Sequence, residues 1–222
     1  LTQGVAVCLP DVRGMGETCP DSSRQPRSEA TALSATELIL GRTLLGSRIL
    51  GLRIVMAYLR VHEEVTWFTL WGDSFAPTNS VGFCDPLIGE DDSPVQSEPL
   101  GGLLALIGAL YEDDVSAVSV RGMLTGFASL LDDVFCYVPH DAVVPGALTV
   151  GDLCDVAAAL APRPLRMEGL VDGRNCVATQ ENVNARFEPA IRAYAREPDR
   201  LVLAPGPGDD FATWLVASPI SE

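Results

Sequence analysis

The chain has 222 residues, of which 47% are hydrophobic and 20% charged, and this length fits one domain with a sizeable core. Thirty acidic residues against fifteen basic ones give a formal net charge of −15, so most of the surface would repel a nucleic-acid backbone or an anionic membrane. All fifteen basic residues are Arg, which excludes lysine Schiff bases and the Lys-dependent phosphate loop. We therefore expect one soluble domain over residues 1–222, without nucleic-acid or membrane partners.

The first 60 residues predict a strand, a loop and a long helix. Residues 4–10 are apolar and β-branched and lead into the Gly-containing segment 11–16, which is typical of a buried strand that enters a turn. Residues 17–34 are rich in Ser, Pro and charge without a period, so they predict an exposed loop. Apolar residues in 35–60 recur at steps of three or four with Arg between them, which predicts an amphipathic helix that can bend at Gly41 or Gly46.

Strands and helices alternate in the rest of the chain. Further strands are predicted at 65–71, 115–120, 164–171 and 200–204, and further helices at 98–111, 150–160, 181–196 and 210–217. An irregular segment at about 75–97 is inserted after the second strand, and a cap-like excursion covers about 122–160. This alternation predicts an α/β three-layer sandwich, with a mostly parallel sheet, helices on both faces and ligands at the carboxyl ends of the strands.

Ser74 is the candidate nucleophile. It follows the predicted strand 65–71 in the segment Gly72-Asp-Ser-Phe-Ala76. A serine at an abrupt junction after a buried strand can project its hydroxyl above the sheet, and small flanking residues allow the tight backbone that this requires. Because Asp and Ser are common turn residues, an ordinary turn is the alternative interpretation.

Asp172 is the candidate orienting acid. It closes the predicted strand 164–171 and precedes Gly173. An acyl-transfer site needs a carboxylate that orients its base, and the chain order of Ser followed by Asp fits that requirement. The alternative is an Asp-Gly turn residue.

The ordered set of motifs resembles the α/β-hydrolase superfamily, most closely its acetyl xylan esterase and prolyl-oligopeptidase-like branches. The resemblance spans nearly the whole chain and is carried by Asp11-Val-Arg-Gly-Met-Gly-Glu17, Leu44-Leu-Gly46 with Tyr58-Leu59, Gly72-Asp-Ser-Phe-Ala76, and Ala161-Pro-Arg-Pro-Leu165 before Asp172. It implies a serine hydrolase of carboxylic esters, in which Ser74 attacks an acyl carbon and Asp172 orients a His. The substrate would be a small-molecule or carbohydrate ester.

The chain departs from that pattern at the catalytic histidine. The superfamily places this residue in a loop after the last strand, but residues 204–211 contain no His. His62 stands beside two Glu residues and is typical of a solvated surface position. His140 lies in the excursion that often covers the site in such folds, so it is the candidate non-standard base, with a structural His beside Asp141 as the alternative.

Two further departures concern the serine. The superfamily's earlier strands, including one whose loop donates an oxyanion N–H, would precede Leu1, and a strand between those matched by 4–10 and 65–71 is absent. We therefore expect the chain to be part of a longer protein, whose N-terminal part is its partner. Segment 75–97 should also separate Ser74 from the N–H groups of the following helix. Ser97, at the start of that helix, is an alternative elbow, although Pro99 lacks an N–H and a cap role is favoured.

Three other interpretations remain. The chain could be a catalytically degenerate hydrolase-like domain with a structural or carbohydrate-binding role in a larger protein. Trp67, Trp71 and Trp214 would then be candidates for stacking on sugar rings, although the sequence positions of these tryptophans favour core packing. Gly72-Asp-Ser74 with Asn79 also resembles the GDSL or SGNH hydrolases, but no Asp-x-x-His block stands near the end of the chain. Dinucleotide binding is disfavoured because 11–16 holds only a fragment of the glycine fingerprint.

The cysteines do not predict a metal centre. Six cysteines are scattered without a C-x-x-C pair, and only two His residues complement them. Buried thiols with at most one disulfide are the favoured interpretation. We expect neither metal nor cofactor, and the compartment stays open, with secretion and the periplasm among the options.

Overall fold

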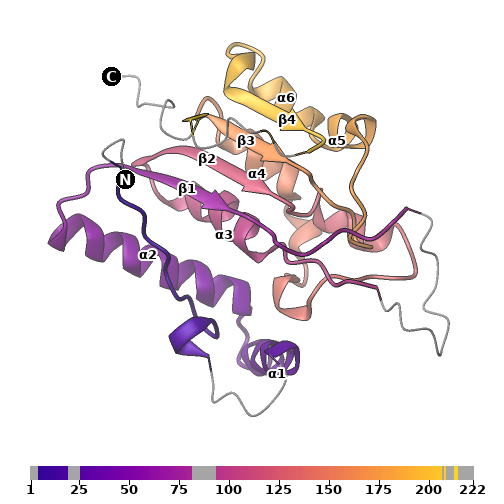
Figure 1. Ribbon diagram of the computed structural model, residues 1–222, viewed down its shortest axis with the longest axis horizontal. Helices are drawn as coiled ribbons and strands as arrows, with labels where there is room; N and C mark the ends of the chain where they lie inside the picture. The colour runs from indigo at the N-terminus through magenta and orange to yellow at the C-terminus, as the bar shows by residue number, and fades with distance from the viewer. Residues whose placement is uncertain (1–4, 20–25, 82–93, 207, 209–212, 215–222) are drawn as a thin grey trace.

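The computed structural model describes residues 5–19, 26–81, 94–206, 208 and 213–214 (Figure 1). One all-parallel sheet has the strand order β1-β2-β3-β4, with β1 at Phe68–Gly72, β2 at Val115–Arg121, β3 at Leu165–Glu168 and β4 at Leu201–Ala204. The α-helices are α1 (Pro26–Ile39), α2 (Leu44–His62), α3 (Leu100–Gly108), α4 (Leu153–Ala159), α5 (Gln180–Arg186) and α6 (Glu188–Ala193). Short 3-10 helices include η2 (Ala109–Tyr111), η3 (Phe127–Leu131) and η4 (His140–Ala142). The predicted fold class, an α/β sandwich built on a parallel sheet, is confirmed.

The strand pleat separates an apolar side of the sheet from a polar one. Val118 and Leu165 are aligned across β2 and β3 and are fully buried in the core. The next aligned pair, Ser119 and Arg166, points to the opposite side because successive side chains alternate along a strand. α3 packs against β1 and β2, α2 packs on α3, and α4 packs on α6.

The strand predicted at residues 4–10 is wrong. Residues 5–10 lie outside the sheet, and the side chains of Val7 and Leu9 are 68% and 86% exposed. β1 is the edge strand, so no described strand pairs with this segment. An apolar, β-branched composition cannot form a strand by itself, because the backbone N–H and C=O groups of a strand need a partner.

The predicted loop at 17–34 and the predicted helix at 35–60 are also corrected. α1 begins at Pro26, a residue whose fixed φ and missing N–H suit the first turn of a helix. Gly41, with a φ of +73°, follows α1 and separates it from α2. Thr43 then caps α2 by accepting a hydrogen bond of 3.1 Å from the Gly46 N–H. The long helix is therefore two helices, and the break is at Gly41.

The later elements follow the prediction more closely, with two differences. Ser97 does not cap α3, because its N–H and hydroxyl both donate to the Tyr137 carbonyl and the cap position is Pro99. The helix predicted at 181–196 divides at Phe187, where Pro189 stands in the first turn of α6. Residues 82–93 and most of the helix predicted at 210–217 lie outside the described residues.

The cysteines at positions 8, 136, 154 and 176 are free, and Cys84 lies outside the described residues. Within the described residues, no single helix is long and apolar enough to cross a membrane. One bent pair, His140–Thr149 with Leu153–Ala159, meets those requirements by length and composition alone.

Candidate functional site

Ser74 lies two residues beyond β1, at the carboxyl edge of the parallel sheet. Its side chain packs on Gly122, the residue that follows β2. A Cβ atom on Gly122 would lie 2.6 Å from the Ser74 Cβ atom and 3.3 Å from Ser74 Oγ. Gly122 also has a φ of +64°, which favours glycine. The serine is therefore positioned by the end of one strand and by a glycine at the end of the next.

The first turn of α3 returns to this edge. A Cβ atom on Gly72 would lie 2.0 Å from the carbonyl oxygen of Gly101, and one on Gly101 would lie 2.9 Å from that of Asp73. Two glycines thus allow the end of β1 and the start of α3 to touch through their backbones. The expectation that segment 75–97 removes the helix N-terminus from the serine region is wrong, because the inserted chain leads back to it.

A chain of alternating charges crosses the carboxyl edge beside Ser74. Arg121 Nη1 lies 3.7 Å from Asp73 Oδ2, and Arg121 Nε lies 3.1 Å from Glu168 Oε2. Arg166 Nη2 lies 2.5 Å from Glu168 Oε1, which also accepts a hydrogen bond of 3.2 Å from the Gly208 N–H. Glu168 is 1% and Arg166 5% exposed. Among the described residues, the carboxylates of Asp73 and Glu168 thus alternate with the guanidinium groups of Arg121 and Arg166.

Sequence reasoning missed these charged residues. Arg121 and Glu168 are the last residues of β2 and β3, and they are neighbours in the register of the two strands. The available signal was a charged residue at the carboxyl end of two largely buried strands, in Val-Ser-Val-Arg121 and Leu-Arg-Met-Glu168. A buried charge is retained only with a partner, so this signal could have indicated an ion pair at the sheet edge.

Asp172 mainly stabilises its own turn. Its Oδ1 atom accepts hydrogen bonds of 2.9 Å from the N–H groups of Arg174 and Cys176, and its backbone N–H donates to the Cys176 carbonyl. Its Oδ2 atom lies 3.9 Å from Arg174 Nε. This arrangement matches the alternative interpretation of Asp172 as a turn residue.

The loops that follow Ser74 and Asp172 nevertheless lie side by side. Asn79 forms a parallel bridge with Cys176, and its side-chain amide donates a hydrogen bond of 2.7 Å to the Arg174 carbonyl. Asn175 donates in return to the Pro77 carbonyl, at 2.9 Å. The structure therefore brings the two predicted loops together, but within the described residues no hydrogen bond joins the Ser74 and Asp172 side chains.

His140 contacts a different part of the molecule. Its Nδ1 atom lies 3.0 Å from the hydroxyl of Ser34 in α1. The neighbouring Asp141 pairs with Arg48 of α2 at 2.5 Å, and both side chains are buried. Arg48 Nε also donates to the Arg13 carbonyl, at 3.0 Å. His140 therefore belongs to a polar cluster that connects α1, α2 and η4, as the structural alternative requires.

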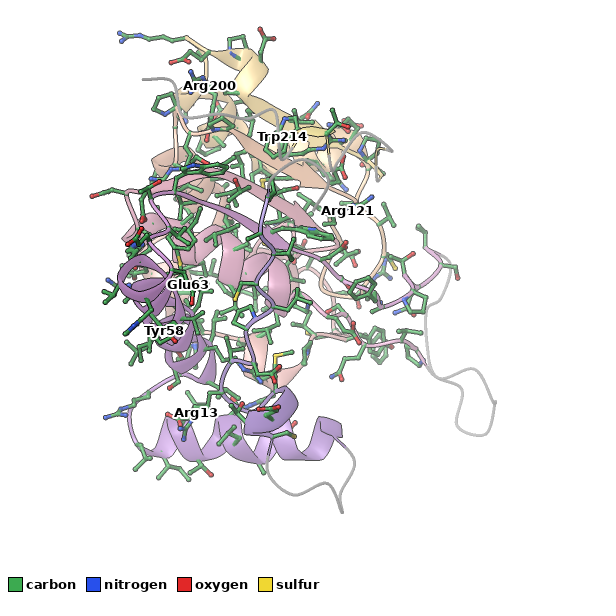
Figure 2. The ribbon with its side chains drawn as sticks, turned by 60° about the vertical axis from the view of Figure 1, so that its left-hand side comes forward. Arg13, Tyr58, Glu63, Arg121, Arg200 and Trp214 are labelled. Carbon is green, nitrogen blue, oxygen red and sulfur yellow. The ribbon has the colours of Figure 1, made fainter. Side chains whose placement is uncertain are left out.

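His62 is no better placed to act on Ser74. It ends α2, is exposed, and stacks on Tyr58 with ring centroids 4.3 Å apart. β1 begins six residues later, so His62 precedes the amino end of the strand that carries Ser74 at its carboxyl end. In Figure 2, Tyr58 and Arg121 lie on opposite sides of the molecule.

The core-packing interpretation of two tryptophans is wrong. Trp67 and Trp71 are 43% and 49% exposed. Trp71 stands in register with Ser119 and, through it, with Arg166, on the polar side of the sheet. Trp214 is partly buried and lies over the Arg166 guanidinium, 5.9 Å from its central carbon to the ring centroid.

A cysteine nucleophile or a metal centre finds no support at this edge. Burial raises the pKa of the Cys176 thiol, and the Asp172 carboxylate raises it further, so the thiol stays protonated near neutral pH. No group of three His, Cys, Asp or Glu side chains among the described residues could hold a metal ion.

Comparisons with protein-family models, with curated proteins and with solved structures gave no match for this chain. What the structure shows is the parallel α/β fold, with a serine, an ion-pair chain and two joined loops at its carboxyl edge.

Proposed function

We propose that this chain is a catalytically degenerate hydrolase-like domain. The observation that supports this proposal is the position of the two imidazoles. His140 Nδ1 faces the Ser34 hydroxyl at 3.0 Å, and His62 stacks on Tyr58. Neither imidazole is therefore placed beside Ser74 as the base that a serine hydrolase uses to activate its nucleophile.

The carboxylates near Ser74 do not replace that base. Asp73 Oδ1 accepts the backbone N–H of Ser74 at 2.9 Å, and its Oδ2 atom faces Arg121. Asp172 accepts two N–H groups of its own turn. A general base must reach the proton that it removes, directly or through one water, and these oxygens have other partners.

A serine esterase is the competing function, and the location of Ser74 supports it. Ser74 lies at the carboxyl edge of a parallel sheet, which is where ligands bind in open α/β folds. The first turn of α3, whose N–H groups have no partner within the helix, contacts Gly72 and Asp73. This function would require His140 to leave Ser34 and approach Ser74.

A fluorophosphonate probe separates the two functions. We expect the full chain to show no more labelling than Ser74→Ala and to leave short-chain acyl esters unhydrolysed, with thermal unfolding showing that both proteins are folded. Ser97→Ala is the matched control. Labelling that is lost in Ser74→Ala and His140→Ala but kept in Ser97→Ala would establish the esterase instead.

Carbohydrate binding is a second candidate, favoured by the exposure of two tryptophans. Trp67 lies immediately before β1 and Trp71 lies within it, and both side chains are nearly half exposed. Exposed indole faces can stack on rings of an ester-bearing or plain glycan. We expect the chain to migrate more slowly in a native gel that contains soluble xylan than in one without it. Trp71→Ala should abolish this retardation. Phe75→Ala, at an 86% exposed position, is the control. Equal mobility with and without the polysaccharide would contradict this candidate.

A further inference from the structure

α2 carries apolar side chains on two opposite sides. One side packs into the core through Leu45, Leu52 and Met56, which are at most 9% exposed. The second set comprises Leu50, Ile54, Tyr58 and Val61, with exposed fractions of 57%, 61%, 56% and 73%. At about 100° of rotation per residue, this second stripe lies roughly opposite the first.

A contiguous stripe of exposed apolar side chains is typical of a surface that a partner covers. A protein surface is the natural cover for the outer stripe of α2. Its spacing fits a second helix. The positions Ser47, Leu50, Ile54, Ala57 and Val61 follow one another at steps of three and four residues, which is the spacing of a coiled-coil seam. Ser47 and Ala57 are small, which allows another helix to approach closely.

The charges around the stripe favour a second copy of this chain as the occupant. Residues 38–62 contain no Asp or Glu, although the chain has thirty of them, so α2 itself brings no negative charge to a contact between two acidic copies. Arg42 is exposed before the start of α2, and Glu63 and Glu64 are exposed after its end. In an antiparallel pair, Arg42 of each copy would face the two glutamates of the other.

We propose that α2 packs antiparallel against α2 of a second copy and forms a symmetric homodimer through the Leu50–Ile54–Tyr58–Val61 stripe. Figure 2 shows Tyr58 and Glu63 at one side of the molecule, away from Arg121 and the carboxyl edge of the sheet. The same patch would be used by both copies, as in most symmetric dimers. This dimer does not depend on the proposed function.

Sedimentation velocity tests the dimer. We expect the 222-residue chain to sediment with twice its mass of 23.6 kDa, and Ile54→Glu to sediment as the monomer. Val150→Glu is the matched control, because Val150 is 94% exposed and lies outside α2, and it should remain dimeric. A monomeric wild type would overturn the proposal, as would an Ile54→Glu dimer or a monomeric control.

Charge reversal tests the antiparallel arrangement. Arg42→Glu should weaken the dimer at low salt, and adding Glu63→Arg should restore it, because the opposite charges would again face each other. Circular dichroism verifies that each variant is folded, which we expect because all of the substituted side chains are exposed. A double variant that remains as weak as Arg42→Glu would overturn the antiparallel arrangement.

Discussion

Replacing Glu168 by Ala should strongly lower the free energy of unfolding. The carboxylate is 1% exposed and compensates two guanidinium groups, with Arg166 Nη2 at 2.5 Å and Arg121 Nε at 3.1 Å. Removing one partner of a buried ion pair costs about 3–5 kcal/mol because a buried charge is left uncompensated. The Arg121 side chain is 23% exposed and also faces Asp73, whereas the Arg166 side chain is only 6% exposed. We therefore expect a loss of about 3 kcal/mol, the lower end of that range.

Urea unfolding followed by circular dichroism measures this loss. A loss of about 3 kcal/mol at an m-value of about 2–3 kcal/mol/M lowers the urea midpoint by about 1 M or more. Glu188→Ala is the matched control, because its pair with Arg192 joins side chains that are 52% and 71% exposed and should contribute under about 1 kcal/mol. The double variant Arg166→Met with Glu168→Met should recover part of the loss, because it removes the buried Arg166 guanidinium together with the carboxylate and leaves Arg121 facing Asp73. A Glu168→Ala midpoint equal to that of the control would refute the reasoning.

Three further predictions concern single positions. Gly122→Ala should lower the free energy of unfolding by about 2 kcal/mol or more, because the new Cβ atom would lie 2.6 Å from the Ser74 Cβ atom and alanine disfavours a φ of +64°. A thermal unfolding curve like that of the wild type would contradict this prediction. The hydrogen bond from Arg60 lowers the pKa of Asp114, so this pair stabilises the fold fully above the unfolded carboxyl's pKa and loses its effect as pH falls through the lower folded value. In urea titrations Asp114→Asn should therefore lower the free energy of unfolding by about 1 kcal/mol near pH 6 and by progressively less as the pH falls below the unfolded carboxyl's pKa, and a cost that does not change with pH would be the contrary result. Burial raises the pKa of the Cys176 thiol, so it should react with a disulfide reagent only when the protein unfolds, after the exposed cysteines have reacted. Mass spectrometry of timed samples measures the order of labelling, and labelling of Cys176 in the folded protein would contradict this prediction.

The strands of the sheet could be predicted where an apolar, β-branched segment also has another strand beside it in the fold. Segments 65–71 and 115–120 became β1 and β2 with shifts of a few residues at most. Segment 4–10 has the same local character but no strand beside it, and strand pairing is a non-local property that a composition window does not contain. The helix period likewise indicated residues 35–60, yet the positive φ of Gly41 decides that two helices form.

The candidate site was predicted less well than the fold, for a physical reason. A motif places Ser74 and Asp172 on loops at one edge, and the structure does bring those loops together through Asn79 and Cys176. The chemistry depends on where each polar atom finds its hydrogen-bond partner, and partners distant in sequence decide this. His140 has its partner in Ser34, 106 residues away along the chain. No periodicity or spacing in the sequence encodes such a contact.

The carboxyl edge of this sheet is better suited to holding charges than to moving a proton. Asp73, Arg121, Glu168 and Arg166 alternate in sign, so Arg121 lies between two carboxylates and Glu168 between two guanidinium groups. For Asp73 to accept the proton of the Ser74 hydroxyl, one of its oxygens would have to give up either the Ser74 N–H or Arg121. Giving up Arg121 would take away one of the carboxylates that face its guanidinium, and breaking ion pairs in a partly buried network costs more than breaking them in water. The contacts that fix the position of Ser74 therefore also oppose its activation, which is why we favour a degenerate domain over an esterase with a carboxylate base.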